Sequence, residues 1–334
     1  MKSPFTGKEM KIVKEWRTMS FRKNSFDVLF HAYECEDTGE QFEDDALANL
    51  NYNQLVNQYR VKYRIPFPEQ IIAIRNKYGV SATKMSEILG FGVNSYRQYE
   101  SGEVPSQSNA RLIQLVDDPH EFKKLVDLSS TLETNAIQKI HKNIKKQLEA
   151  RKENKQEKYL ERYFFSTYLP TSFTGYKKPD LNKFAGMVVF FAEQLAPWKT
   201  KLNKLLFYTD FLMYKRTGFS MSGIQYRAIS MGPVPNKFNS IFEYLDNKEE
   251  VDIHFTNFIN GGTGEQFKPA AYKKFNKELF SEFELSILSE VAMRFEKTTT
   301  DEMIDISHKE KAWLENKEEK KLIDYKYSFE LNQV

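Results

Sequence analysis

The chain has 334 residues, with 49 Lys and Arg, 46 Asp and Glu and a single Cys. This length predicts about two domains. A hydrophobic fraction of 40% suffices for packed cores and excludes a disordered chain, and one Cys excludes a disulfide framework. The first ten residues lack the apolar segment of a signal peptide, and the longest apolar run, residues 187–192, is too short to cross a bilayer. We therefore expect a cytoplasmic protein without membrane contact.

The positive charge of the chain is concentrated in one stretch. Residues 131–165 carry nine basic and five acidic side chains, whereas the whole chain has a formal net charge of only +3. A basic field over the whole molecule is therefore excluded. Any contact with DNA must be local and depend on particular side chains.

The first 65 residues predict a small β-rich module followed by a helix. Residues 26–33 alternate between apolar and mixed positions, which is the period of a strand. The apolar positions are Phe26, Val28, Phe30 and Ala32. Residues 45–64 have a helical pattern that ends before Pro66, because the residue that precedes a proline is disfavoured in the helical region.

Residues 66–130 contain the signals of five short helices. Pro68 suits the first position of a helix, and Gly79 ends that helix. Residues 90–92, Gly-Phe-Gly, form a turn before a third helix over residues 93–101. The predicted N-caps of the other helices are Ser81, either Ser106 or Ser108, and Asp118.

The rest of the chain predicts a charged connection and a second, mostly helical region. No Gly or Pro interrupts residues 133–169, which favours a solvated connecting helix; a helix that touches DNA phosphates is the alternative. After Pro170, apolar stripes at helical spacing alternate with a strand and turn over residues 224–235. A strand pair is expected around residues 261–264, and Thr300 is the predicted cap of the last helix.

Together these patterns predict an α+β fold that is predominantly α-helical. Five regions are expected along the chain. They are a ribbon-like β-rich module at 1–44, a connecting helix at 45–65, a helix-turn-helix domain at 66–130, a charged helical linker at 131–169 and a mostly helical domain with a small β element at 170–334.

A helix that follows a glycine-containing turn in a bundle of short helices is the plan of a helix-turn-helix. The N-terminal residues of such a reading helix meet base edges in the major groove. Tyr96 and Tyr99 are expected to pack inward, whereas the residues at i, i+3 and i+4 share an exposed face. The predicted base-reading residues are Asn94, Ser95, Arg97 and Gln98, since Asn and Gln suit adenine and Arg suits guanine. The predicted phosphate contacts are Ser81, Thr83, Lys84, Ser106, Gln107, Ser108 and Asn109.

Two groups of residues within 1–128 form a recognisable signature. The first is Gly-Phe-Gly-Val-Asn at 90–94, followed by Arg-Gln-Tyr-Glu at 97–100 with Gly102 and Pro105. The second is Tyr-Glu-Cys at 33–35 with Thr-Gly-Glu at 38–40. They resemble the MqsA-type antitoxins, which implies a zinc ribbon before an Xre-like helix-turn-helix that dimerises and represses transcription.

The ligand positions of this ribbon depart from the family pattern. Ser3 and Thr6, and then Cys35 and Thr38, keep the two-residue gap of a zinc knuckle. Three of these four positions carry hydroxyls, whereas structural zinc takes thiolate, imidazole or carboxylate ligands. We therefore expect a degenerate ribbon that binds no metal, and no other cofactor.

A second signature lies in residues 180–316. Residues 201–208 read Lys-Leu-Asn-Lys-Leu-Leu-Phe-Tyr, residues 226–228 lead to Gly-Pro-Val-Pro at 232–235, and residues 307–310 read Ser-His-Lys-Glu. The combination resembles the Panacea, or SocA-like, antitoxin domain, which implies direct binding to a toxin. The motif positions, most of them structural, are Lys204, Tyr208, Arg227, Gly232, Pro233 and Trp313.

The sequence carries no pattern of an enzyme. The five His residues have no metal-ligand spacing, and Gly-Gly-Thr-Gly at 261–264 lacks the Gly-Lys-Ser/Thr ending of a phosphate loop. His308 and Glu310 are two residues apart, so they do not face each other on a helix. We therefore expect function by binding, without catalysis.

The resemblances imply an antitoxin that neutralises a cognate protein toxin through its C-terminal domain. Its helix-turn-helix would bind operator DNA as a homodimer and repress its own operon. The sequence leaves two alternatives open. One is a one-component helix-turn-helix regulator whose C-terminal domain senses a ligand or a phage protein, and the other is an adaptor that delivers a toxin to a protease.

Overall fold

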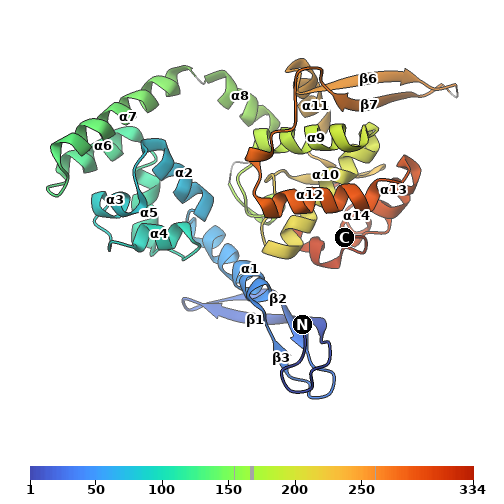
Figure 1. The fold of residues 1–334 in the computed structure, drawn as a ribbon, viewed down its shortest axis with the longest axis horizontal. Coiled ribbons are helices and arrows are strands. Elements are labelled where there is room, and N and C mark those ends of the chain that lie inside the picture. Colours follow the sequence, from blue (N-terminus) through green and yellow to red (C-terminus); the bar gives the residue numbers. More distant parts are fainter. Residues whose placement is uncertain (154, 166–168, 260) are drawn as a thin grey trace. The chain divides into compact units, whose positions relative to one another are not determined.

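The structure, a computed structural model, describes residues 1–153, 155–165, 169–259 and 261–334 (Figure 1). The predicted α+β class with predominant helices is confirmed. The chain forms two compact units. The N-terminal unit comprises Met1–Gly39 and Asn51–Leu160, and the C-terminal unit comprises Glu40–Leu50 and Glu161–Val334.

The N-terminal unit begins with a long antiparallel hairpin. Strands β1 (Lys11–Phe21) and β2 (Asn24–Glu34) pair in register from Lys11 opposite Glu34 to Phe21 opposite Asn24. The predicted strand at 26–33 is thus confirmed. A short strand, β3 (Gln41–Phe42), follows, and α1 (Asp45–Tyr63) forms the predicted connecting helix.

Side-chain amides of α1 occupy the second edge of β2. Asn51 accepts from the His31 N–H at 2.9 Å and donates to the His31 carbonyl at 2.8 Å. Gln54 makes the same pair of bonds to Leu29, at 3.1 and 2.9 Å. These amides replace a neighbouring strand, so this part of the edge is not available for pairing with another chain.

Five short helices follow as predicted. They are α2 (Pro68–Tyr78), α3 (Ala82–Ile88), α4 (Ser95–Glu100), α5 (Gln107–Leu115) and α6 (Pro119–Leu128). Ser81, Ser106 and Asp118 are the N-caps of α3, α5 and α6, and Gly79 ends α2 with a φ of 63°. The third helix is shorter than expected, because Asn94 is still its N-cap and only Ser95–Glu100 are helical.

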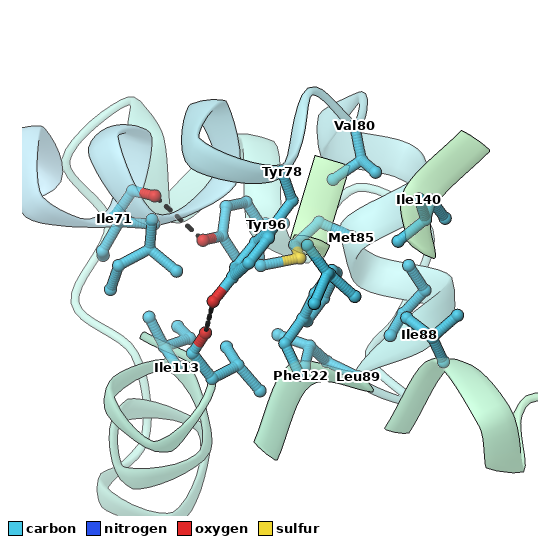
Figure 2. Close-up of a cluster of buried hydrophobic side chains, with 14 of the residues drawn as sticks. Ile71, Tyr78, Val80, Met85, Ile88, Leu89, Tyr96, Ile113, Phe122 and Ile140 are labelled. Atoms are coloured by element: carbon cyan, nitrogen blue, oxygen red, sulfur yellow. Dashed lines mark hydrogen bonds between the residues drawn. The ribbon is translucent and has the colours of Figure 1, made fainter. Parts of the chain in front are cut away.

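The charged stretch forms α7 (Thr134–Glu153) and α8 (Lys155–Phe164). The stretch predicted as a solvated connecting helix has one buried face in α7. Ile140 and Ile144 are buried in the core of the short helices, which Figure 2 shows around Tyr96, Phe122 and Ile140. Apolar residues at a spacing of three to four along a charged helix are enough to give it a buried face.

The C-terminal unit is built around one buried helix. The helix α10 (Lys199–Thr217) is buried from Lys201 to Tyr214 and packs beside α9 (Leu181–Leu195), α12 (Glu282–Phe295) and α13 (Thr300–His308). Its Asp210 accepts hydrogen bonds from the backbone N–H groups of Met221 and Ser222 and from the Tyr226 hydroxyl. These donors satisfy a carboxyl that is fully buried.

The β elements of this unit match the predicted segments. Strands β4 (Tyr226–Ile229) and β5 (Gly232–Pro235) form a sheet with β8 (Leu322–Ile323), in the order β5-β4-β8. The predicted strand pair is β6 (Val251–Asn257) with β7 (Thr263–Pro269). The remaining helical elements are α11 (Phe238–Asn247), α14 (Lys311–Leu314) and the 3-10 turns Ser172–Thr174, Lys277–Leu279 and Tyr325–Glu330.

One cap prediction is wrong by one residue. Thr299, and not Thr300, caps α13: its side chain accepts from the Glu302 N–H, and Glu302 reaches back to the Thr299 N–H. The reciprocal pair requires an acidic residue three positions after the cap, and only Thr299 has one there.

Candidate functional site

Two tyrosines anchor α4, the predicted reading helix, to the bundle. The Tyr96 hydroxyl donates to the Ile71 carbonyl of α2 at 2.9 Å (Figure 2), and the Tyr96 N–H donates to Ser86 at 3.0 Å. Asn109 of α5 donates to the Tyr99 hydroxyl at 2.8 Å. Burial raises the pKa of Tyr96, so its hydroxyl remains a donor. The expectation that both tyrosines pack inward is confirmed.

The opposite face of α4 presents unpaired polar groups. Asn94, Arg97 and Gln98 are exposed, and within the described ranges their side chains make no hydrogen bond or ion pair. Ser95, the fourth predicted base-reading residue, is half-buried. Amide and guanidinium groups in this state can bond to base edges without first breaking a contact in the protein.

Some of the predicted phosphate-contacting side chains already have a partner within the protein, and others do not. Ser81 and Ser106 accept from backbone N–H groups as helix caps, each at 3.1 Å. Lys84 forms an ion pair with Glu87 at 2.7 Å, and Asn109 already holds Tyr99. The other three predicted phosphate contacts are Thr83, Gln107 and Ser108. They are exposed, and their side chains form no hydrogen bond with a described residue.

Most cations of the helical bundle are neutralised in place. Arg75 pairs with Glu100 at 2.5 Å, and Lys77 pairs with Asp117. Arg97 and Arg111 are exposed and form no ion pair with another described residue. The positive charge offered to a nucleic acid by α2 to α5 therefore comes mainly from these two side chains.

Two arginines hold the loop that follows α4. Arg60 of α1, which is 1% exposed, donates to the Gly102 carbonyl at 2.8 Å and to the Glu103 carbonyl at 3.4 Å. Arg22, in the turn between β1 and β2, donates to the Val104 carbonyl and, at 2.7 Å, to the Pro105 carbonyl. We call this arrangement the arginine clamp; it connects the hairpin and α1 to the loop at the end of α4.

The four predicted ligand positions of the ribbon meet around one sulfur. Cys35 is buried, and its Sγ lies 3.7 Å from Thr6 Oγ1. Hydrogen bonds with the side chains of Ser3, Thr38 and Thr6 lower the pKa of this thiol to about 6. One thiol among hydroxyls does not make a zinc donor set, and the described residues contain no group of three His, Cys, Asp or Glu placed to hold a metal.

Most motif residues of the C-terminal unit have structural contacts. The Tyr208 hydroxyl donates to Glu310 at 3.2 Å, Arg227 donates to the Lys320 carbonyl at 2.6 Å, and Trp313 Nε1 donates to the Ile229 carbonyl at 2.7 Å. Gly232, with a φ of 96°, and the buried Pro233 begin β5. Lys204 differs from the others, because its amine is buried and bonded to no described group.

Comparisons with known proteins agree with both signatures. Residues 1–127 match the family of the "antitoxin component of bacterial toxin-antitoxin system, MqsA". Residues 202–314 match the family "antitoxin SocA-like, Panacea domain". Both ends of the chain resemble antitoxins. The two predicted resemblances, to MqsA at 1–128 and to the Panacea domain at 180–316, are thus confirmed, although the second match begins later.

The same comparisons gave no match to a curated protein or to a solved structure. In the part of the chain that the structure describes, no helix is both long and apolar enough to cross a membrane. The MqsA match covers the ribbon and α4. The Panacea match covers α10 to α14 except for the first three residues of α10.

Sequence reasoning missed some residues that the structure brings to these sites. Arg22 and Arg60 lie more than 40 positions from the carbonyls they bind, and nothing local to either residue indicates such a contact. His308 belongs to the Ser-His-Lys-Glu motif, in which the spacing excludes Glu310 as its partner and indicates no other. In the structure His308 stacks on Trp313, whereas Glu310 bonds to Tyr208 and to Asn332.

Proposed function

We propose that this chain is the antitoxin of a toxin–antitoxin pair and acts by binding, without catalysis. Its C-terminal Panacea domain binds the cognate toxin directly. Its helix-turn-helix binds operator DNA as a homodimer and represses the operon. The observation that carries the proposal is that two separate segments of the chain match two different antitoxin families.

The geometry of α4 supports the DNA-binding part of this proposal. A reading helix needs an apolar face that fixes it and an opposite face of free polar groups. Tyr96 and Tyr99 provide the first, and Asn94, Arg97 and Gln98 provide the second. Because two copies related by a two-fold axis read two half-sites, the operator is expected to contain half-sites about one helical turn apart, or a multiple of it.

Growth of cells tests the toxin-binding part. Expression of the neighbouring reading frame alone should arrest growth, and co-expression of the full chain should restore it and yield a stable complex on purification. A harmless neighbour would contradict the antitoxin proposal and favour a one-component regulator. Rescue in which the toxin disappears from the cells would favour the protease adaptor.

Binding to the promoter DNA of its own gene tests the repressor part. The double variant Asn94→Ala and Arg97→Ala should lose about 1–3 kcal/mol of affinity for each base contact removed. Gln138→Ala, at an exposed position of α7, is the matched control and should bind as the unaltered chain does. Equal affinity of the double variant and the control would refute the assignment of α4 as the reading helix.

A further inference from the structure

The amine of Lys204 lies inside the C-terminal unit without a partner. The side chain is 0% exposed, and its Nζ forms no hydrogen bond with any described residue. Burial of an ammonium is strongly unfavourable unless another group compensates its charge. An amine in such a position either loses its proton or takes a partner that the described residues do not supply.

A second unpartnered nitrogen belongs to the neighbouring side chain of His308. Its Nε2 is buried and has no hydrogen bond to a described residue. The imidazole stacks on Trp313, with 3.8 Å between ring centroids and 10° between ring planes, and the Ser230 backbone bonds to it. Burial, and then the charge of Lys204, lower the pKa of His308, as expected when two cationic groups are close together.

The backbone at Gly232 lies directly against the same place. A Cβ at this position would lie 2.5 Å from Ser307 Oγ and 2.8 Å from Lys204 Cε, and the φ of 96° also favours glycine. The Ser307 hydroxyl already donates to the Ile304 carbonyl at 2.9 Å. Among the residues that the structure describes, the side-chain donors without a partner at this place are the Lys204 amine and, when protonated, His308 Nε2.

We propose that Lys204 and His308 together bind one carboxylate group. An ammonium and an imidazolium can each donate to one of its two oxygens, and charge-assisted bonds of this kind are stronger than neutral ones. Phosphate, with more oxygens to satisfy, fits two donor groups less well. The other charged side chains that act on His308 are Asp305 of α13 and Lys317, which lies over the Trp313 ring.

The titration of His308 in the full-length chain tests this site. Histidine labelled with ¹⁵N reports the pKa of each imidazole, and His308→Gln identifies the resonance. Sodium acetate in place of sodium chloride, at constant ionic strength, should raise the pKa of His308 by about 1–3 units, because a negative charge within hydrogen-bond reach favours the imidazolium. No change in the presence of acetate would overturn the proposal.

Two lysine variants show whether the acetate response depends on Lys204 or on any lysine of the same helix. Lys204→Met should raise the pKa of His308 without acetate, since a neighbouring positive charge is gone, and should abolish the response to acetate. Lys201→Met is the matched control on the same helix, because its amine already donates to the carbonyls of Glu296 and Thr298. An acetate response that survives in Lys204→Met would contradict the proposal.

The inference goes beyond the proposed function, since acetate binding is measured on the chain alone. The carboxylate has two possible sources, a free small acid or an acidic side chain of the toxin. Loss of the acetate response in the toxin complex would identify the toxin as the source, and a retained response would identify a free acid. A failed acetate titration would refute the carboxylate site and leave the result of the growth test unaffected. The carboxylate site and the antitoxin function can therefore be refuted independently.

Discussion

Lys204 makes the stability of the C-terminal unit depend on pH. Burial lowers the pKa of this amine from 10.5 to about 7. Between these values the unfolded chain binds the proton and the folded chain does not, so stability is lower at pH 6 and rises as the pH increases from 7 to 10. Lys204→Met removes this dependence and should stabilise the unit by roughly 2–5 kcal/mol at pH 6, since one pKa unit corresponds to about 1.4 kcal/mol.

Denaturant unfolding at pH 6 and pH 9 measures this effect. The gain from Lys204→Met should be largest at pH 6 and less than half as large at pH 9, because most of the interval between the folded and unfolded pKa has then been crossed. Lys201→Met should instead destabilise the unit at both values, because the Glu296 and Thr298 carbonyls lose their donor. A Lys204→Met variant that is less stable than the unaltered chain at pH 6 would show that the buried amine has a compensating partner.

Residues whose contacts are local could be predicted from the sequence. Gly79, Ser81 and Asp118 perform the capping roles expected of them, because a cap bonds to groups two to four positions away. The pair Lys204 and His308 could not be found in this way. The two residues lie on separate helices, α10 and α13, and only the folded unit places them together.

The arginine clamp connects three elements of the N-terminal unit, so its removal should affect DNA binding. Arg60→Met leaves the part-buried carbonyls of Gly102 and Glu103 without this donor and removes a buried side chain, which should cost about 1–3 kcal/mol of unfolding free energy. Arg22→Gln removes an exposed guanidinium and should cost less stability. Both variants should weaken operator binding, because the loop sets the end of the reading helix.

Lys23→Gln provides the matched control for Arg22→Gln. Lys23 is the exposed neighbour of Arg22 in the same turn, with a similar φ of 62°. Thermal unfolding and operator affinity of the three variants give the comparison. If Arg22→Gln and Lys23→Gln bind the operator equally well, the clamp has no part in DNA recognition.

The helix α7 carries a stripe of exposed lysines that we expect to be silent in DNA binding. The stripe consists of Lys139, Lys142 and Lys146, opposite the buried Ile140 and Ile144. The helix α7 packs on α2 and α6, whereas α4 packs on α2 and α3, so we expect the stripe to lie away from the exposed face of α4. This supports the interpretation that the outer face of α7 is solvated rather than bound to phosphates.

The salt dependence of operator affinity tests this expectation. Each phosphate contact contributes a slope of about −0.9 in log K against log salt. Arg111→Gln should make the slope shallower by up to about two in a homodimer, whereas Arg97 is assigned to a base edge and is not counted as a phosphate contact. The triple variant Lys139→Gln, Lys142→Gln and Lys146→Gln is the control and should leave the slope unchanged; a shallower slope there would place α7 on the DNA.

For the whole molecule, the sequence predicted the succession of elements better than the limits of the compact units. The N-terminal unit extends to Leu160, because the apolar face of α7 packs on the short helices. The C-terminal unit includes Glu40–Leu50, a segment that sequence reasoning grouped with the ribbon and the connecting helix. Such limits depend on contacts between distant segments, which periodicity does not encode.

Two compact units with separate cores predict two separate unfolding transitions for this chain. Lys204→Met at pH 6 should raise the midpoint temperature of the C-terminal unit's transition and leave that of the N-terminal unit unchanged. Arg60→Met should lower only the other, since Arg60 is buried in the N-terminal unit. Differential scanning calorimetry measures both. A single transition that both variants shift would mean that the two units unfold together, and a ligand bound to one unit would then stabilise the fold of the other by mass action.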